Sequence, residues 1–173
     1  SGSYVEAVPT MVYWGGKDGF SPKRRLEIPF YSGNICSIAD VNDDGYPDLI
    51  LVSQVHNVSS PKTYNGFHVY FGSKTGSFSK SVTLREYGAH GLAVADIDHD
   101  GWLDILGMID DGPPKSRGWV IWRGGPGGFS DDRRIFIPFP QAHGEMALAD
   151  INHNGWLDVA VPSMTTNQIR IYH

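Results

Sequence analysis

The feature that most constrains this chain is a nine-residue pattern that occurs three times. The copies span residues 40–48, 96–104 and 150–158, and each is followed by an apolar run. Each copy has Asp or Asn at positions 1, 3, 5 and 9 and a Gly at position 6. Alternating oxygen ligands that close on a Gly turn form a cage for a hard cation, and this ligand set is typical of Ca²⁺. The alternative for each loop is an Asx-rich turn that holds no metal.

The EF-hand loop shares this opening, but two features of the sequence argue against it. An EF-hand loop runs twelve residues to a bidentate acid and lies between two helices. Position 12 of the three copies is Leu51, Gly107 and Val161, so the acid is missing each time. The segments on either side, such as 37–39 and 49–52, are short, apolar and rich in β-branched residues, which is typical of buried strands. We therefore expect each loop to connect two strands.

Composition and the absence of common motifs indicate a single turn-rich domain and argue against several classes of protein. The chain has 173 residues, which favours one compact domain, and its 21 Gly and 11 Pro favour many turns and short strands. No apolar run is long enough to span a membrane, and no basic run indicates a nucleic-acid surface. The sequence contains none of the common motifs of hydrolases, kinases or dinucleotide enzymes, so we expect no enzyme. Cys36 is the single cysteine, and its apolar neighbours predict a buried, unreactive thiol.

A longer repeat of about 55 residues surrounds the loops. An alternating strand that ends in a Gly turn recurs at 10–16, 67–73 and 119–125. An Arg-rich segment at 19–30 matches 128–139, and a more polar version lies between them. Each unit would thus contain four strands: one before the loop, one after it, the aromatic strand and the Arg-rich strand. Alternating Ala residues favour an inner position for the first strand, whereas Pro and charge favour a solvent-facing edge for the last.

With these flanking strands, the motif D-x-[DN]-x-[DN]-G-x-x-D resembles the FG-GAP repeat, also called the VCBS-type repeat. That family includes the integrin α-subunit propeller, a fungal lectin and many bacterial surface proteins. The resemblance implies an all-β fold, a β-propeller built of four-stranded blades, with about three blades in this chain. The chain would be a single propeller segment, 1–173, with repeats at approximately 11–66, 67–118 and 119–173. Because the repeat serves adhesion, sugar binding and scaffolding alike, it is a weak guide to function.

The resemblance also implies the ligands of three Ca²⁺ sites. In each loop four side chains and the backbone carbonyl at position 7 would bind the ion. They are Asp40, Asn42, Asp44, Tyr46 and Asp48 in the first loop; Asp96, Asp98, Asp100, Trp102 and Asp104 in the second; and Asp150, Asn152, Asn154, Trp156 and Asp158 in the third. The third loop offers the fewest carboxylates, so we expect it to be the weakest site and the second loop the strongest.

The strand count predicts an incomplete ring. The chain opens on the last two strands of one blade, continues through two whole blades and ends on the third strand of another, at 168–172. Closed propellers have four to eight blades. Either the chain is a piece of a longer propeller, or copies pair head to tail. In a homodimer, two copies would make six blades, with a strand exchanged between the chains.

Aromatic and histidine side chains are the candidates for ligand contacts. Trp102 and Trp156 occupy the same position of their loops, where they either stack on sugars or seal one blade against the next. His90 and His143 precede inner strands and are expected near the channel or a cleft between blades. The long polar loop at 54–65, which contains a glycosylation sequon, is a further candidate for recognition.

These features favour a Ca²⁺-stabilised binding module that is extracellular, on the cell surface or periplasmic. Its partner would be a carbohydrate, as for a lectin, or a cell-surface protein. The alternatives are a self-assembling scaffold without a ligand and, more remotely, a fragment of a polysaccharide-acting enzyme.

Overall fold

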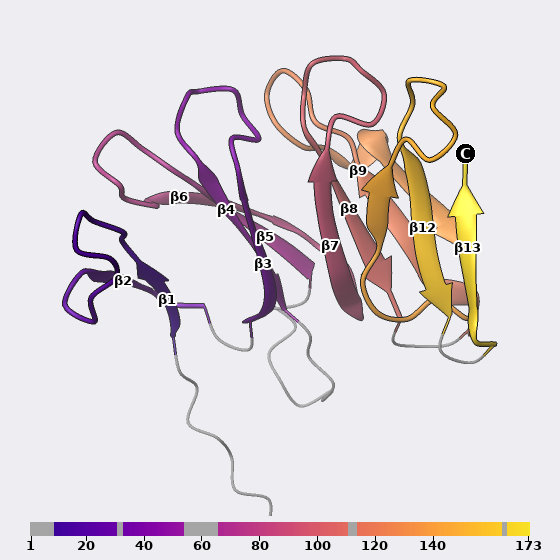
Figure 1. The fold of residues 1–173 in the computed structure, drawn as a ribbon, viewed down its shortest axis with the longest axis horizontal. Coiled ribbons are helices and arrows are strands. Elements are labelled where there is room, and N and C mark those ends of the chain that lie inside the picture. Colours follow the sequence, from indigo (N-terminus) through magenta and orange to yellow (C-terminus); the bar gives the residue numbers. More distant parts are fainter. Residues whose placement is uncertain (1–8, 31–32, 54–65, 111–113, 164–165) are drawn as a thin grey trace, which may run out of the picture.

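The structure is a computed structural model that describes residues 9–30, 33–53, 66–110, 114–163 and 166–173. Over these ranges the chain forms thirteen β-strands and two short 3₁₀ helices, Pro114–Ser116 and Asp131–Arg133. The predicted all-β fold is confirmed. The strands form four antiparallel sheets that stand next to one another (Figure 1). None of the described helices is long and apolar enough to cross a membrane.

Two of the sheets are complete four-stranded blades. Blade 1 consists of β3 (Gly33–Ala39), β4 (Asp48–Ser53), β5 (Gly66–Phe71) and β6 (Lys80–Leu84), in that order. Blade 2 consists of β7 (Ala89–Ala95), β8 (Asp104–Ile109), β9 (Gly118–Trp122) and β10 (Arg134–Pro138), also in chain order. In both blades the nine-residue loop joins the first strand to the second. The four-strand unit expected from the sequence is therefore confirmed.

The other two sheets are partial blades. The strands β1 (Thr10–Tyr13) and β2 (Arg25–Ile28) pair with each other and correspond to the third and fourth strands of a blade. Blade 3 contains β11 (Ala147–Ala149), β12 (Asp158–Ser163) and β13 (Gln168–Tyr172), which correspond to the first three. An isolated bridge between Ala142 and Ser163 extends this sheet.

The second strand of each complete blade packs against both neighbouring sheets. All six residues of β4 are buried, as are all six of β8. Since successive side chains of a strand point to opposite faces, Leu49 and Leu51 pack toward β1 and β2, whereas Ile50 and Val52 pack toward blade 2. Burial on both faces explains why these strands appear in the sequence as continuous apolar runs. The cores between the sheets hold the blades together.

One position in the core between blades 1 and 2 requires a glycine. Phe67 of β5 is fully buried, and its ring points at Gly107 of β8. A Cβ at Gly107 would lie 2.8 Å from Cε2 of that ring and closer still to Cζ and Cε1. Real Cβ atoms essentially never approach so closely, so the bare backbone of Gly107 makes room for the ring. The same position of the repeat is Leu51 in blade 1 and Val161 in blade 3.

An ion pair joins the outer parts of blades 1 and 2. Arg134, at the start of β10, donates from Nε and Nη2 to the two carboxylate oxygens of Glu86, and the Nη2 bond is 2.9 Å long. Glu86 is buried, with 8% of its surface exposed. The hydrogen bond with Glu86 raises the pKa of Arg134, which keeps the guanidinium charged. The Arg134 guanidinium also lies over the rings of Trp122 and Phe136.

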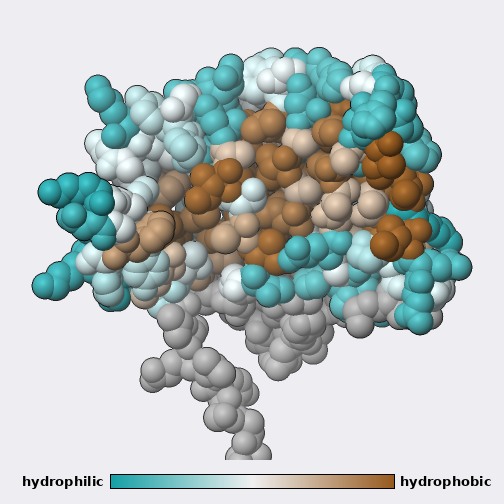
Figure 2. All heavy atoms as spheres, in the orientation of Figure 1, coloured by the Kyte–Doolittle hydropathy of each residue, from teal (hydrophilic) through white to brown (hydrophobic). Residues whose placement is uncertain are grey.

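The inner strands are less buried than the central ones. Figure 2 shows apolar residues gathered over the middle of the face on which the inner strands lie. In β3, Ile35 and Ala39 pack into the core with blade 2, whereas Cys36 and Ile38 point the other way and are exposed. The prediction of a buried Cys36 is therefore wrong. The described chain places only two outer strands, β1 and β2, on that side of blade 1, so they do not cover Cys36.

Candidate metal centres

The three nine-residue loops share one backbone conformation. Position 4 adopts a left-handed φ in each loop, between 56° and 59°, and the Gly at position 6 has a φ of 85° or 90°. Asp and His tolerate the left-handed region better than most residues, and Gly adopts it without strain. The residues at position 4 are Asp43, His99 and His153, and those at position 6 are Gly45, Gly101 and Gly155. These two residues let the chain reverse within the loop, which brings the backbone of positions 5 and 6 back to the Asp at position 1.

The Asp at position 1 holds the loop together in all three copies. Its two carboxylate oxygens accept hydrogen bonds from the backbone N–H groups of positions 5 and 6. The distances are 3.1 and 2.8 Å for Asp40, 3.2 and 3.0 Å for Asp96, and 3.0 and 2.8 Å for Asp150. Because a carboxylate oxygen has more than one acceptor site, each of these oxygens can still bind a cation.

The Asp at position 9 is buried and anchors the loop to the sheet. Asp48 and Asp104 are fully buried, and Asp158 is 1% exposed. One oxygen of each accepts a hydrogen bond from the N–H of position 2 at 2.9–3.1 Å. The other oxygen of Asp48 accepts the N–H of Gly72, and that of Asp104 accepts the N–H of Gly124, both at 2.8 Å.

Burial of these carboxylates creates a demand for positive charge. Desolvation raises the pKa of Asp48 and of Asp104; the N–H donors oppose this rise, and the neighbouring loop carboxylates add to it. In the third loop burial also acts to raise the pKa of Asp158, but hydrogen bonds from Ile151 and His173 outweigh it, and the pKa falls below its usual value. A cation beside Asp48 or Asp104 would offset the cost of keeping a buried carboxylate ionised.

The second loop fits a bound cation most clearly. Ligand oxygens of Asp96, Asp98 and Asp104 lie within 4.8 Å of one another. The Oδ1 atom of Asp98 is buried and has no hydrogen-bond partner among the described residues. Its other oxygen lies 3.3 Å from Nη1 of Arg123. An all-oxygen donor set with a buried, unpaired carboxylate oxygen fits Ca²⁺ rather than a softer metal.

In the first and third loops, predicted ligand side chains make hydrogen bonds with each other or with His173. Asn42 donates to Asp44 at 3.0 Å, so these two predicted ligands lie together. In the third loop Nδ1 of His173 lies 2.9 Å from Asp158 and 3.1 Å from the amide of Asn152. Neither His173 nor Arg123 was predicted from the sequence. Both follow the third strand of their blade directly, and that shared place in the repeat was the available signal.

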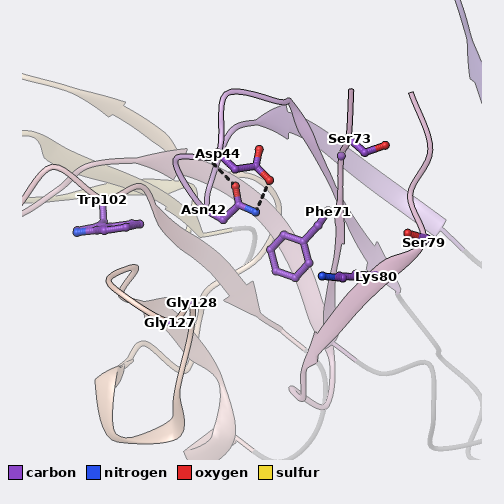
Figure 3. Close-up of a pocket in the computed structure, with 10 residues that line it drawn as sticks. Asn42, Asp44, Phe71, Ser73, Ser79, Lys80, Trp102, Gly127 and Gly128 are labelled. Carbon is purple, nitrogen blue, oxygen red and sulfur yellow. Dashed lines mark hydrogen bonds between the residues drawn. The ribbon is translucent and has the colours of Figure 1, made fainter. Parts of the chain in front are cut away.

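A cleft lies next to the first loop, where blades 1 and 2 meet (Figure 3). Its volume is about 490 Å³. Two aromatic residues line it together with polar side chains and glycines: Phe71, Trp102, Asn42, Asp44, Ser73, Ser79, Lys80, Gly72, Gly127 and Gly128. In Figure 3, the ring of Trp102 lies on one side of Asn42 and Asp44 and the ring of Phe71 on the other.

The four predicted ligand-contact residues lie in three places rather than one. Trp102 lines the cleft. Trp156 is 52% exposed and stacks on His99 of the second loop, with ring centroids 4.6 Å apart and planes within 9°. His90 and His143 lie together, with ring centroids 5.7 Å apart. The long loop at 54–65 falls outside the described residues.

Comparison with known proteins identifies the repeat. Residues 40–107 match the family model described as FG-GAP-like repeat. This stretch runs from the first loop through blade 1 and into β8, so it contains one full repeat of the pattern. Over these residues the match, together with the four-stranded sheets, shows an FG-GAP-like repeat that folds into blades of the β-propeller type.

Among curated proteins the chain is similar to integrin α chains. It is 26% identical to Integrin alpha-IIb of Mus musculus over 98% of this chain, and 30% identical to Integrin alpha-IIb of Homo sapiens over 86%. It is 24% identical to Integrin alpha-PS3 of Drosophila melanogaster over 82% of this chain. The alignments cover 19%, 16% and 14% of these relatives, so the chain spans less than a fifth of their length.

Proposed function

We propose that the three loops bind Ca²⁺ and that the bound ions stabilise the turns of a recognition module outside the cell or on its surface. The observation that carries the metal assignment is the buried, unpaired Oδ1 of Asp98 beside Asp96 and Asp104. The ion would supply positive charge beside this oxygen, whereas Arg123 pairs with the other oxygen of Asp98. Similarity to integrin α chains supports the location. We expect the second site to bind most tightly and the third most weakly, because ligand charge falls in that order.

Terbium luminescence tests the metal assignment. Tb³⁺ replaces Ca²⁺ at oxygen sites, and Trp102 and Trp156 lie within two of the three loops, where they can sensitise its emission. We expect three sites that Ca²⁺ competes for, and two in Asp98→Ala. The matched control is Asp43→Asn, which alters an exposed acid of the first loop that the ligand assignment does not include. Three sites in Asp98→Ala, or no site in the unaltered protein, would disprove the ligand assignment.

We further propose that the cleft lined by Trp102 and Phe71 binds a carbohydrate of a cell-surface partner. Sugars pack their apolar C–H faces on aromatic rings, while their hydroxyl groups take hydrogen bonds from polar side chains. The cleft offers both kinds of group, because Ser79 and Lys80 line it together with the two rings. Its volume of about 490 Å³ falls within the range of small-molecule sites.

A glycan array tests the carbohydrate assignment. We expect binding in Ca²⁺, and loss of that binding in Trp102→Ala, which removes the ring but keeps the backbone carbonyl assigned to the metal. Trp156→Ala is the matched control, since this loop Trp lies against His99 and does not line the cleft. Glycan binding that survives Trp102→Ala, or an array without signal, would reject this cleft as a sugar site.

Self-assembly is the second candidate, and exposed apolar side chains favour it. Ile38 on β3 is 66% exposed, and Ile169 and Ile171 on β13 are 69% and 46% exposed. A head-to-tail homodimer would bury both regions. Light scattering of the 19.1 kDa chain tests this candidate. A dimer mass in Ca²⁺ that Ile169→Asp reduces to the monomer mass would support it, and a monomer mass at every protein concentration would exclude it.

A further inference from the structure

A second cluster of metal-binding side chains lies far from the nine-residue loops. His90 at the start of β7, Asp110 just after β8, and His143 before β11 place one ligand atom each within 4.8 Å of one another. Asp104 of the second loop stands at the opposite end of β8 from Asp110. Six residues of extended chain separate the two acids, or about 20 Å. The cluster is therefore separate from the loop sites.

The geometry of the cluster differs from that of an ordinary ion pair. Nδ1 of His90 lies 3.1 Å from Oδ2 of Asp110, yet neither atom makes a hydrogen bond with a described residue. Nε2 of His143 lies 3.8 Å from the same oxygen. Two nitrogens thus face one carboxylate oxygen without donating to it. In a tetrahedral zinc site, ligand atoms about 2.05 Å from the metal lie about 3.3 Å apart, and the two observed distances are on either side of this value.

Burial of Asp110 makes the cluster unfavourable in free energy without a cation. The Asp110 side chain is 4% exposed, and its Oδ2 is buried without a hydrogen bond among the described residues. A buried carboxylate oxygen without a hydrogen bond is expensive unless a cation lies beside it. The side chain of His90 is 16% exposed and that of His143 is 45% exposed. The side of the cluster at His143 is therefore open to solvent, which leaves room for a water molecule as a fourth ligand.

The backbone around the cluster holds the two histidines at a fixed separation. A register shift between His90 and Leu92 marks a bulge at Gly91, and bulges re-aim neighbouring side chains. A Cβ at Gly91 would lie 2.7 Å from the carbonyl oxygen of Gly144 and 3.0 Å from Cβ of Met108. The residues next to the two histidines are thus in direct contact. Because the His90 strand belongs to blade 2 and His143 leads into blade 3, a metal ion bound by both histidines would connect the two blades.

We propose that His90, Asp110 and His143 bind one first-row transition-metal ion, with Zn²⁺ as the best-fitting ion, at the junction of blades 2 and 3. Two imidazoles and one carboxylate suit Zn²⁺, whereas Ca²⁺ takes oxygen ligands and suits the loops. The protein would therefore bind two classes of metal at opposite ends of its strands. The transition-metal ion would act as a clip between neighbouring blades.

Zinc titration with Ca²⁺ held in excess tests this proposal on the full chain. Isothermal calorimetry should find one Zn²⁺ per chain, and Co²⁺ bound at the same site should give the intense visible absorption of a four-coordinate ion. Asp110→Asn and His143→Gln change the ligand with little change in shape, and each should weaken Zn²⁺ binding by at least the roughly 10–100-fold that loss of an outer-shell partner costs. His153→Asn removes an exposed histidine of the third loop and is the matched control, with binding unchanged.

The variants distinguish Zn²⁺ binding at the proposed site from Zn²⁺ binding elsewhere on the chain. His143→Gln is the safer variant if Asp110→Asn fails to fold, because the His143 side chain is half-exposed. Loss of the Zn²⁺ signal and of the Co²⁺ spectrum in His143→Gln but not in His153→Asn supports the site. The proposal is overturned if the unaltered chain binds no Zn²⁺ in excess Ca²⁺, if Ca²⁺ displaces the Zn²⁺, or if binding survives in His143→Gln.

Discussion

The fit of Phe67 against Gly107 predicts that the cost of one added methyl group depends on a residue in the neighbouring blade. In Gly107→Ala, the new Cβ would meet three ring atoms of Phe67, the nearest of them well inside van der Waals distance. Phe67 is fully buried within the core cluster, so the ring cannot move aside into solvent. Overpacking of a core costs about 1–3 kcal/mol, and a clash of this depth belongs at the upper end, about 3 kcal/mol.

In the Phe67→Leu background the same substitution should cost almost nothing. Leu lacks the Cζ and Cε atoms that the new Cβ would meet, and replacing a strand Gly with Ala gains about 0.5–1 kcal/mol in backbone entropy. The two substitutions should therefore couple by about 2–3 kcal/mol, at the upper end for residues in contact. The contact joins two blades, so this coupling measures how tightly neighbouring blades fit.

Urea unfolding of the four variants in saturating Ca²⁺ measures the coupling, provided that all four have the same m-value. Gly15→Ala is the control, because its Cβ would meet only Cε1 of Phe20 at 3.8 Å, an ordinary contact. It should change the unfolding free energy by less than about 0.5 kcal/mol. An equal cost of Gly107→Ala in both backgrounds would refute the argument that the glycine makes room for Phe67.

Three further predictions follow from the ion pair, the loops and the inner strand. Arg134→Met should lower the unfolding free energy by about 2–3 kcal/mol in urea unfolding, because it leaves the Glu86 carboxylate buried without a partner. Arg25→Met breaks the exposed pair with Glu27 and should cost less than about 1 kcal/mol. Equal costs in the two variants would contradict the role of burial. EDTA should lower the melting temperature in calorimetry, since Ca²⁺ at 100 times its dissociation constant stabilises the folded state by about 2.7 kcal/mol per site. An unchanged melting temperature would rule out a stabilising role for Ca²⁺ in the loops. Cys36 should react with a thiol reagent in the native protein at close to the rate of the unfolded chain, and strong native protection would contradict its exposure.

The fold could be predicted from the sequence because its signals are local and repeated. The strands on both sides of each loop are short apolar runs, and the Gly at position 6 fixes the turn between them. Three copies in register then reveal the four-strand unit. The strand order within each blade follows from this, because consecutive antiparallel strands joined by short loops lie next to each other.

What could not be predicted depends on contacts between blades. The exposure of Cys36 depends on which strands of the neighbouring sheet cover β3, and the local apolar pattern does not contain that information. The approach of Asp110 to His90 and His143 requires two blades to meet, so no local pattern around Asp110 indicates it. Arg123 and His173 reach the loops from a strand that lies later in the chain, and no short motif records their proximity.

The strand order of the blades has a consequence for how such a chain changes through evolution. Each described blade is built from consecutive strands, and the ladders pair strands of the same blade only. Duplication of one whole unit would therefore lengthen the array without breaking a ladder hydrogen bond. The side-chain surfaces at the new junction would have to adapt, and a duplicate of blade 2 would set its own β9 residue Trp119, rather than Phe67, against Gly107. Mutations that let copies diverge should accordingly concentrate at the interfaces between units, while the sequences of the loops and paired strands remain similar.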